Sequence, residues 1–436
     1  MNTDVSDRSG RLSLEKTLRT IAKFVEKNKG TILDLYKAPL YNDEPKIFNY
    51  SARHKTSTTG DFDIASGFSF NKEVALIRVL AEAIERFSLS TYRPRILARK
   101  TAGHAARLRN FIDPLLLSPF SKHQLMQNRF EKFRIKKTSR FNWTNAYLLS
   151  SNKKVLVPAQ LMSFMAQSDD LIVMPINSTG TAFGLTLEDA LYRAICEVVE
   201  RDAFVIAYLN KIPSPQVSLD KIRDKEISYI LSILQRYRLE LVVMDLTTDI
   251  GIPVFCAIIV DKTGLGPSVS VGLKAGVETR ECLIGAIEEA LMTRSWIRDR
   301  VIYMQGGNVN AIKDIQERAE LWFPTNMIKK LDFWLKSDNK SKIKITRTKT
   351  NRWELTKKSL EDIGIGVIYK NISPDEVRNS NLFVVRVLIP SLQQFYLDEA
   401  YQFFGNKRLY EVPIKLKFTN RRKDESGLNS IPHPFL

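Results

Sequence analysis

Two stretches of this 436-residue chain repeat one pattern and decide how we expect it to fold. Residues 65–89 read ASGFSFNKEVALIRVLAEAIERFSL, and residues 180–204 read GTAFGLTLEDALYRAICEVVERDAF. Each stretch opens with small residues around a glycine, continues with a helical pattern and carries the motif Glu-x-x-Glu-Arg. Because self-similarity at a constant spacing marks related structural units, the repeat predicts two loop-and-helix units of the same kind.

The predicted helices, at residues 72–92 and 186–209, carry charged residues along one side. At about 100° per residue these charges fall on one arc, and apolar residues such as Leu80 and Val199 lie opposite. The first charged stripe consists of Arg78, Glu82, Glu85 and Arg86. These four recur 115 residues later as Arg193, Glu197, Glu200 and Arg201, and Asp189 lies on the same arc as this second set.

These stripes have two interpretations. They are typical of a solvated helix face that is stabilised by charge pairs three or four residues apart. Alternatively they line a ligand site, because the small residues that precede both helices, at 65–67 and 178–182, would let a ligand approach the backbone closely. Lysine, the usual surface partner of glutamate, is absent from both stripes. The residues alone leave the two interpretations open.

If the two stripes face each other, several carboxylates converge. Such carboxylates raise each other's pKa, and a hard divalent cation such as Mg²⁺ relieves the repulsion. Arginine guanidinium groups complement phosphate oxygens, so the combination indicates a nucleoside triphosphate held through magnesium. Neither a GxxxxGK[ST] motif nor a protein-kinase signature is present. A third predicted helix, at 281–294, contains Glu288 and Glu289. Either one of these glutamates completes the site, or both are ordinary surface glutamates.

Helical and strand patterns alternate along the chain, which predicts an α/β (α+β) fold with mixed sheets packed against long helices. We expect further helices at 12–28 and 278–299, and strand pairs at 142–160 and 238–261. Residues 40–66, rich in Ser, Thr and Asp, predict an irregular segment, and the C-terminal third is expected to be less regular. No linker long enough to separate independent domains is present.

The composition excludes several classes of protein. With 44% hydrophobic and 26% charged residues the chain is globular, neither disordered nor fibrous. Its apolar runs fall short of the roughly 20 residues of a membrane span, and no secretory signal is evident. Three cysteines without a CxxC motif predict buried thiols in a reducing cytoplasm. The net charge of +18 lies in scattered lysine-rich stretches without a binding module, so we expect no nucleic-acid or membrane partner.

The repeated Glu-x-x-Glu-Arg motif resembles that of the YcaO family. Further stretches fit its SagD-like, azoline-forming branch: MDLTTDIGIPVFCAIIVD, AIEEALMTR, RVLIPSLQQFYLDEAYQFFGNKRLYEVP and the terminal IPHPF. The resemblance implies the YcaO-type ATP-binding fold, with an N-terminal helix and irregular segment at 1–60 belonging to the same fold. Residues 61–436 then form the YcaO domain with a proline-containing tail.

The resemblance also implies an activity. Azoline-forming members use ATP and Mg²⁺ to activate a backbone amide of a ribosomally made precursor peptide, whose Cys, Ser or Thr side chain attacks the preceding carbonyl. The products are thiazolines and oxazolines, as in bacteriocin maturation in the cytoplasm. Within the same fold, peptide thioamidation or amidine formation is the alternative, and a catalytically silent binding or scaffold protein is the alternative from another class.

Site residues follow from the resemblance position by position. It implies ATP contacts from Ser66, Gly67, Glu82, Arg86, Glu197 and Arg201, and magnesium ligands at Glu85, Asp189, Glu200 and Glu289. Asp189 stands where the family usually has glutamate. Many members carry Gly-Lys-Gly where this chain has Gly67-Phe68-Ser69, so a lysine contact is missing unless Lys72 replaces it.

The C-terminal tail is expected to act in catalysis, because azoline-forming members often end in PxPxP. Here Pro432 and Pro434 remain, and Leu436 takes the place of the third proline. His433 between them is either a general base or a spacer.

The expected partners are the precursor peptide and a separate leader-peptide-binding protein. A flavin-dependent azoline dehydrogenase and a homodimer are further associations that the resemblance allows.

Overall fold

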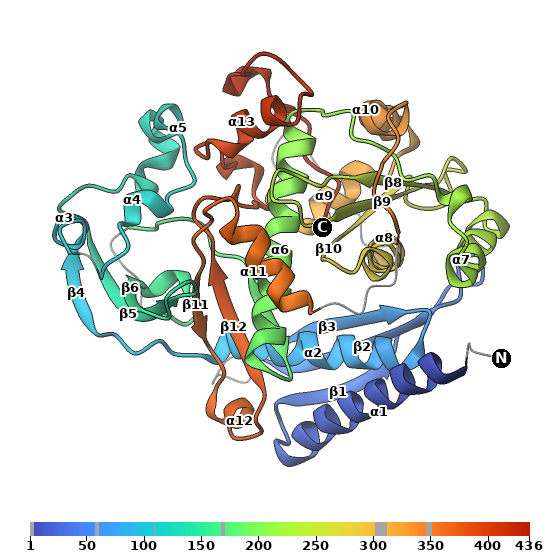
Figure 1. Ribbon diagram of the computed structural model, residues 1–436, viewed down its shortest axis with the longest axis horizontal. Coiled ribbons are helices and arrows are strands. Elements are labelled where there is room, and N and C mark those ends of the chain that lie inside the picture. The colour runs from blue at the N-terminus through green and yellow to red at the C-terminus, as the bar shows by residue number, and fades with distance from the viewer. Residues whose placement is uncertain (1–3, 57–60, 109, 167–170, 301–311, 346–350) are drawn as a thin grey trace.

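The computed structural model describes residues 4–56, 61–108, 110–166, 171–300, 312–345 and 351–436. Its strands form three antiparallel sheets (Figure 1). The first has the order β1-β2-β3, the second β10-β9-β8, and the largest β4-β5-β11-β12-β7, with β6 paired to β5. The strand bounds are β1 Ile32–Lys37, β2 Phe48–Lys55, β3 Phe62–Ser69, β4 Ala98–Thr101, β5 Arg140–Leu148, β6 Lys154–Pro158, β7 Thr181–Gly184, β8 Glu240–Asp245, β9 Val254–Val260, β10 Val269–Ala275, β11 Ile368–Asn371 and β12 Phe383–Leu388.

One strand of each sheet leads into a long helix that packs against it. The three pairs are β3 with α2 (Lys72–Thr91), β7 with α6 (Leu187–Leu209), and β10 with α8 (Thr279–Arg300). Side chains cap two of these helices, because Asn71 accepts a hydrogen bond from Val74 N–H and Thr186 accepts one from Asp189 N–H. The sequence repeat therefore corresponds to strand–helix units, and the structure contains a third such unit.

Helices α2 and α8 approach their strands closely because glycine stands at the contact. A Cβ atom on Gly67 of β3 would lie 2.2 Å from the carbonyl oxygen of Ala75 in α2. A Cβ atom on Gly272 of β10 would lie at the same distance from the carbonyl oxygen of Ala286 in α8. Only a residue without a side chain fits these two positions.

Helix α6 runs through the centre of the molecule (Figure 1) and packs against β7, β12 and β10. Since β7 and β12 belong to the largest sheet and β10 to the second sheet, α6 joins these two sheets. It is buried along most of its length as a result. A separate apolar cluster lies between α1, α2 and the first sheet, and another lies between α7, α8 and the second sheet. The remaining α-helices are α1 Asp4–Lys27, α3 Ala102–Ala105, α4 Pro114–Leu117, α5 Lys122–Met126, α7 Lys225–Arg236, α9 Ile315–Trp322, α10 Asp332–Leu335, α11 Arg352–Glu361, α12 Asp375–Arg378 and α13 Arg408–Lys415.

The predicted helices and strand pairs are confirmed, but the expectation that residues 40–66 are irregular is wrong. Residues 40–66 contain β2 and most of β3, which pair with each other along their whole length. The polar composition misleads here because alternate residues of β3, such as Ala65 and Gly67, are buried. After α8 the described part of the C-terminal third contains only short helices and strands, as expected. Two of these strands, β11 and β12, lie between β5 and β7 in the largest sheet. Among the described residues, no helix is long and apolar enough to cross a membrane.

Candidate active site

The three strand–helix units share one contact between a glutamate of the helix and a backbone N–H of the strand or the turn before it. The contacts are Ser66 N–H to Glu82 Oε2 at 3.0 Å, Gly180 N–H to Glu197 Oε2 at 3.0 Å, and Leu273 N–H to Glu289 Oε2 at 2.6 Å. The spacing along the chain is 16, 17 and 16 residues. The first glutamate of each motif, and Glu289 in the third unit, therefore occupies the equivalent position within its own unit. Ser66 and Gly67 lie within β3, so the prediction that they form a loop is wrong.

The second glutamate of each repeated motif reaches the next unit. Glu85 of α2 accepts a hydrogen bond from the backbone of Phe183 in β7. Glu200 of α6 accepts one from Ala275 N–H in β10, at 2.9 Å. The third unit has Met292 at the corresponding position. The glutamates therefore form a continuous group across the three units: Glu82, Glu85, Glu197, Glu200 and Glu289.

The pKa values of this group reflect burial and mutual repulsion. Burial, with the charges of Glu197 and Glu82, raises the pKa of Glu85 well above its ordinary value. Burial also raises the pKa of Glu197, against the opposing effect of Arg201. Burial and the charge of Glu200 raise the pKa of Glu289 to about 7. A divalent cation bound to these carboxylates would favour their ionised form.

Two arginines face the carboxylates. Arg86 donates to Glu82 Oε1 at 2.7 Å. Arg201 forms ion pairs with Glu197 at 3.5 Å and with Glu200 at 3.0 Å. Its Nε and Nη1 atoms are buried, and neither makes a well-aligned hydrogen bond within the described part of the chain. Arg201 therefore retains donor capacity for an anionic ligand.

Glu288 and Glu289, adjacent in α8, have different environments. Glu288 is buried, accepts a hydrogen bond from Ser69 Oγ at 2.6 Å and pairs with Arg78 at 2.6 Å. Glu289 belongs to the carboxylate group. The interpretation of both as surface glutamates is therefore wrong. Glu288 attaches α8 to the first unit, and Glu289 lines the site.

Asp189 lies apart from the other predicted ligands. It is two turns before Glu197 in α6 and pairs with Arg193 and Arg352. Among the described residues, no three His, Cys, Asp or Glu side chains are placed to hold a metal ion together. The oxygens of the central glutamates instead accept from backbone N–H groups and arginines. As hard oxygen donors under mutual repulsion they suit Mg²⁺, whereas Asp189 as it lies does not join them.

Arg386 of β12 is a site residue that the sequence reasoning missed. It is fully buried, donates to the carbonyl oxygen of Thr179 at 2.6 Å and to Thr181 Oγ1 at 2.9 Å. Its positive charge acts on Glu85 and Glu197. It thus holds the turn that presents Gly180 to Glu197. The available signal was a lone arginine in the apolar strand FVVRVL.

The C-terminal tail packs into the core beside the site. The carbonyl oxygen of Pro432 accepts from Tyr208 Oη at 3.1 Å and from Trp322 Nε1 at 3.0 Å. His433 is buried among aromatic rings and directs Nε2 to the carbonyl oxygen of Tyr396. Burial holds the pKa of His433 well below its usual value, so the ring is neutral. This environment favours the spacer interpretation over the general base.

The other tail residues lie close by. Pro434 is buried, and Leu436 is half-buried. The ring of Phe435 lies over the guanidinium of Arg201, which brings the tail to the carboxylate group. Lys72, the predicted substitute for the missing lysine, is exposed at the first position of α2.

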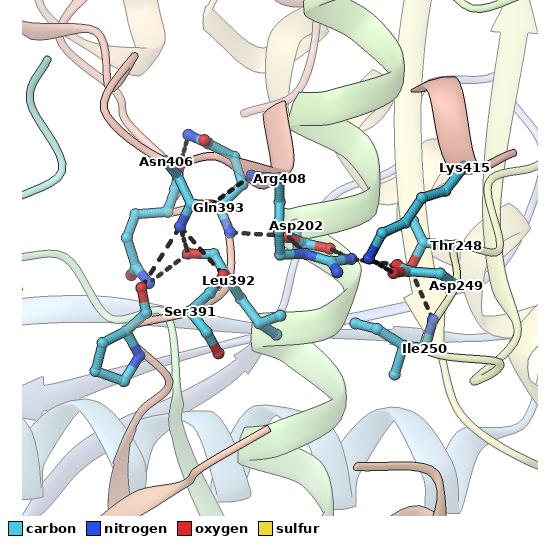
Figure 2. A network of polar contacts seen from close by, with 12 residues as sticks. Asp202, Thr248, Asp249, Ile250, Ser391, Leu392, Gln393, Asn406, Arg408 and Lys415 are labelled. Carbon is cyan, nitrogen blue, oxygen red and sulfur yellow. Dashed lines mark hydrogen bonds and ion pairs between the residues drawn. The ribbon is translucent and has the colours of Figure 1, made fainter. Parts of the chain in front are cut away.

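A second polar network fixes the residue after Arg201 (Figure 2). Asp202 is fully buried and accepts from Arg408 Nε and Nη2, at 2.9 and 2.7 Å, and from Gln393 N–H at 2.7 Å. Arg408 continues to Asp249, which also pairs with Lys415. This network ties α6 to α13 and to the segment after β12.

Comparisons with known proteins agree with this geometry. The family model described as YcaO cyclodehydratase, ATP- and Mg²⁺-binding, matches residues 66–393. A heterocyclase solved in complex with substrate and cofactor has a TM-score of 0.78 and 21% identity, covering 96% of this chain and 57% of that chain. YcaO from Methanopyrus kandleri, bound with AMPPCP and Mg²⁺, has a TM-score of 0.66 and 17% identity, covering 90% and 95%. The E. coli microcin synthetase McbBCD complex has a TM-score of 0.60 and 16% identity, covering 82% and 88%.

These structural matches are distant in sequence and show a shared fold, and this chain spans 57% of the heterocyclase's own length. The family model covers most of this chain, including both copies of the repeated motif. The predicted α/β fold and the predicted family are confirmed. This chain belongs to the YcaO family of ATP- and Mg²⁺-binding cyclodehydratases.

Proposed function

We propose that this protein uses Mg²⁺-ATP to form azoline rings from Cys, Ser or Thr residues of a ribosomally made precursor peptide, as a SagD-like member of its family. The observation that carries the proposal is the group of five glutamates that converge from three strand–helix units. Buried carboxylates that repel one another indicate a cation site, and the adjacent arginines indicate an anion bound with the cation.

Within this proposal, residues of the group have separate roles. Glu85, Glu200 and Glu289 are the Mg²⁺ ligands, and each ion is held by one or two of these carboxylates together with phosphate oxygens of ATP. Glu82 and Glu197 support the nucleotide beside Ser66 and Gly67. Arg86 and Arg201 orient the phosphates. We leave Asp189 outside the metal ligands because two arginines neutralise it.

The chemistry requires no nucleophile from the enzyme, because the substrate side chain attacks its own backbone carbonyl. Bound ATP supplies the phosphoryl group with which the amide oxygen departs. The cysteines of this chain suit this scheme, since all three are buried. Burial raises the pKa of Cys196 to about 12, so its thiol stays neutral and unreactive.

We further propose that a separate protein recruits the precursor peptide. The similarity to a chain of the McbBCD complex, over 88% of that chain, supports a role within a multiprotein assembly. A flavin-dependent azoline dehydrogenase and self-association remain proposals of the same kind.

The nucleotide site is tested by thermal unfolding with and without Mg²⁺-ATP. We expect the nucleotide to raise Tm of the wild-type protein, and Glu85→Gln or Glu200→Gln to abolish this increase. Glu354→Gln, an exposed position on α11, is the control and retains the increase. An unchanged Tm of the wild-type protein with millimolar Mg²⁺-ATP contradicts the proposal.

The product is tested by mass spectrometry of the cognate peptide after incubation with ATP and the partner protein. Loss of one water per modified residue indicates azoline formation. Exchange of oxygen for sulfur indicates thioamidation and refutes the azoline assignment.

A further inference from the structure

Lys274 projects from the third strand–helix unit toward the carboxylate group. It is exposed, whereas the other residues of β10 are buried. Its stem lies over α8, because a Cβ atom on Gly285 would be 3.2 Å from Lys274 Cγ and 3.3 Å from Cδ. Gly285 precedes Glu289 by one helical turn, so both lie on the same face of α8. The lysine therefore runs along the helix face that carries Glu289.

The charge of Lys274 acts on side chains of both neighbouring helices. It opposes the burial-driven increase in the pKa of Glu197 in α6 and of Glu289 in α8. It acts in the same direction on the thiols of Cys196 and Cys282. The geometry agrees, because a Cβ atom on Gly276, two residues after Lys274, would lie 2.6 Å from Tyr192 Oη of α6 and 2.9 Å from Cys282 Sγ of α8. Both helices therefore border the end of β10 from which Lys274 extends.

Among the described residues, Lys274 is the cation near this group that makes no ion pair or hydrogen bond. Arg86 pairs with Glu82, and Arg201 pairs with Glu197 and Glu200. Lys370, by contrast, is buried and donates to Asn145. An exposed lysine with three unused donors beside a group of carboxylates is suited to a ligand that itself carries negative oxygens.

We infer that Lys274 is a nucleotide-binding residue that contacts the phosphate oxygens of ATP from the third strand–helix unit. The inference rests on the proposed nucleotide site and adds to it a residue in β10, a strand outside both copies of the repeated motif. The Lys274 ammonium group and the proposed Mg²⁺ then both contact the phosphate chain of ATP, while the aliphatic part of the Lys274 side chain remains over Gly285.

The test is the dissociation constant of the full-length protein for Mg²⁺-ATP and for adenosine, measured by titration calorimetry. We expect Lys274→Met to weaken Mg²⁺-ATP binding about 10- to 100-fold and to leave adenosine binding unchanged. Lys274→Arg, which keeps the charge, restores most of the affinity. Lys262→Met is the matched control, because Lys262 is exposed after β9 and pairs with Glu240 away from the site.

Each outcome has a defined meaning. If Lys274→Met binds Mg²⁺-ATP like the wild-type protein, or loses affinity for ATP and adenosine equally, the inference is wrong. If the wild-type protein itself binds no Mg²⁺-ATP, the proposed function fails instead. Because Lys274 is exposed, its substitution leaves the core intact, and an unchanged Tm without nucleotide verifies this.

Discussion

The aromatic ring of Phe435, next to the last residue, lies 4.1 Å from the guanidinium carbon of Arg201. Arg201 also pairs with Glu197 and Glu200, so the ring holds an arginine that belongs to the carboxylate group. A cation–π contact of this kind contributes about 0.5 to 2 kcal/mol. The C-terminal tail thereby contacts the carboxylate group through the Phe435 ring, which packs on Arg201.

We therefore predict that Phe435→Leu retains Mg²⁺-ATP binding but lowers kcat about 2- to 30-fold, because Arg201 loses its fixed orientation. Phe435→Tyr keeps an aromatic ring and is expected to turn over at nearly the wild-type rate. The measurement is the rate of water loss from the precursor peptide. A normal rate for Phe435→Leu would show that the contact has no role in turnover.

The second prediction concerns His433 and pH. The burial of its ring, together with the charges of Arg318 and Arg201, keeps the histidine neutral in the folded chain. As pH falls below 6.5, the unfolded chain takes up a proton that the folded chain does not bind. The free energy of unfolding therefore decreases as pH falls and levels off above this value.

Urea unfolding from about pH 8 to about pH 5 measures this dependence. In His433→Gln the contribution of this residue to the slope is expected to disappear. The pH–rate profile of the variant should keep the limbs of the wild-type profile. A limb near neutrality that vanishes in the variant would identify His433 as a general base.

The third prediction concerns the buried pair of Asp202 and Arg408 (Figure 2). We predict that Asp202→Asn destabilises the fold by about 3 to 5 kcal/mol, because the guanidinium of Arg408 loses its buried countercharge. Asp249→Asn removes the other, more accessible partner of Arg408 and should cost about 1 kcal/mol. Urea unfolding of both variants provides the measurement. Equal losses for the two would contradict the view that burial determines the cost.

The fourth prediction concerns the close approach of α2 to β3. Gly67→Ala is expected to destabilise the protein by about 3 kcal/mol, because the new methyl group would overlap backbone atoms of Ala75 and Val79 that cannot move independently. Gly366→Ala is the matched control, since a methyl group added there would meet no atom within 4 Å beyond its chain neighbours, and the backbone is unstrained. We expect it to change stability by less than about 0.5 kcal/mol. A tolerated Gly67→Ala would mean that the helix can shift away from the strand.

The long helices and the shared face of their glutamates could be predicted from the sequence, because both follow from spacing. Glu82 and Glu85 recur at a fixed offset as Glu197 and Glu200, and the helical period places each pair on one face. The same reasoning located Glu289 but could not separate it from Glu288. Their difference arises from contacts with Ser69 and Arg78, which are more than 200 residues away along the chain.

Other parts of the fold depend on pairing between distant strands. Residues 40–66 are polar, and the burial of alternate residues of β3 becomes evident only once this strand is paired with β2 and packed against α2. Arg386 belongs to the site because β12 lies beside β7, a pairing that joins residues about 200 positions apart. No local pattern indicates such a neighbour, since strand order is set by the packing of the whole sheet.

The crossing of Glu85 to β7 and of Glu200 to β10 has a consequence for assembly. Each of these glutamates is anchored by a unit other than its own, so no unit by itself holds a complete set of positioned carboxylates. A chain cut between α6 and β8 would recover nucleotide binding only after its two fragments reassociate. The nucleotide thus recognises the joined molecule, and its binding energy favours the joined form over either fragment.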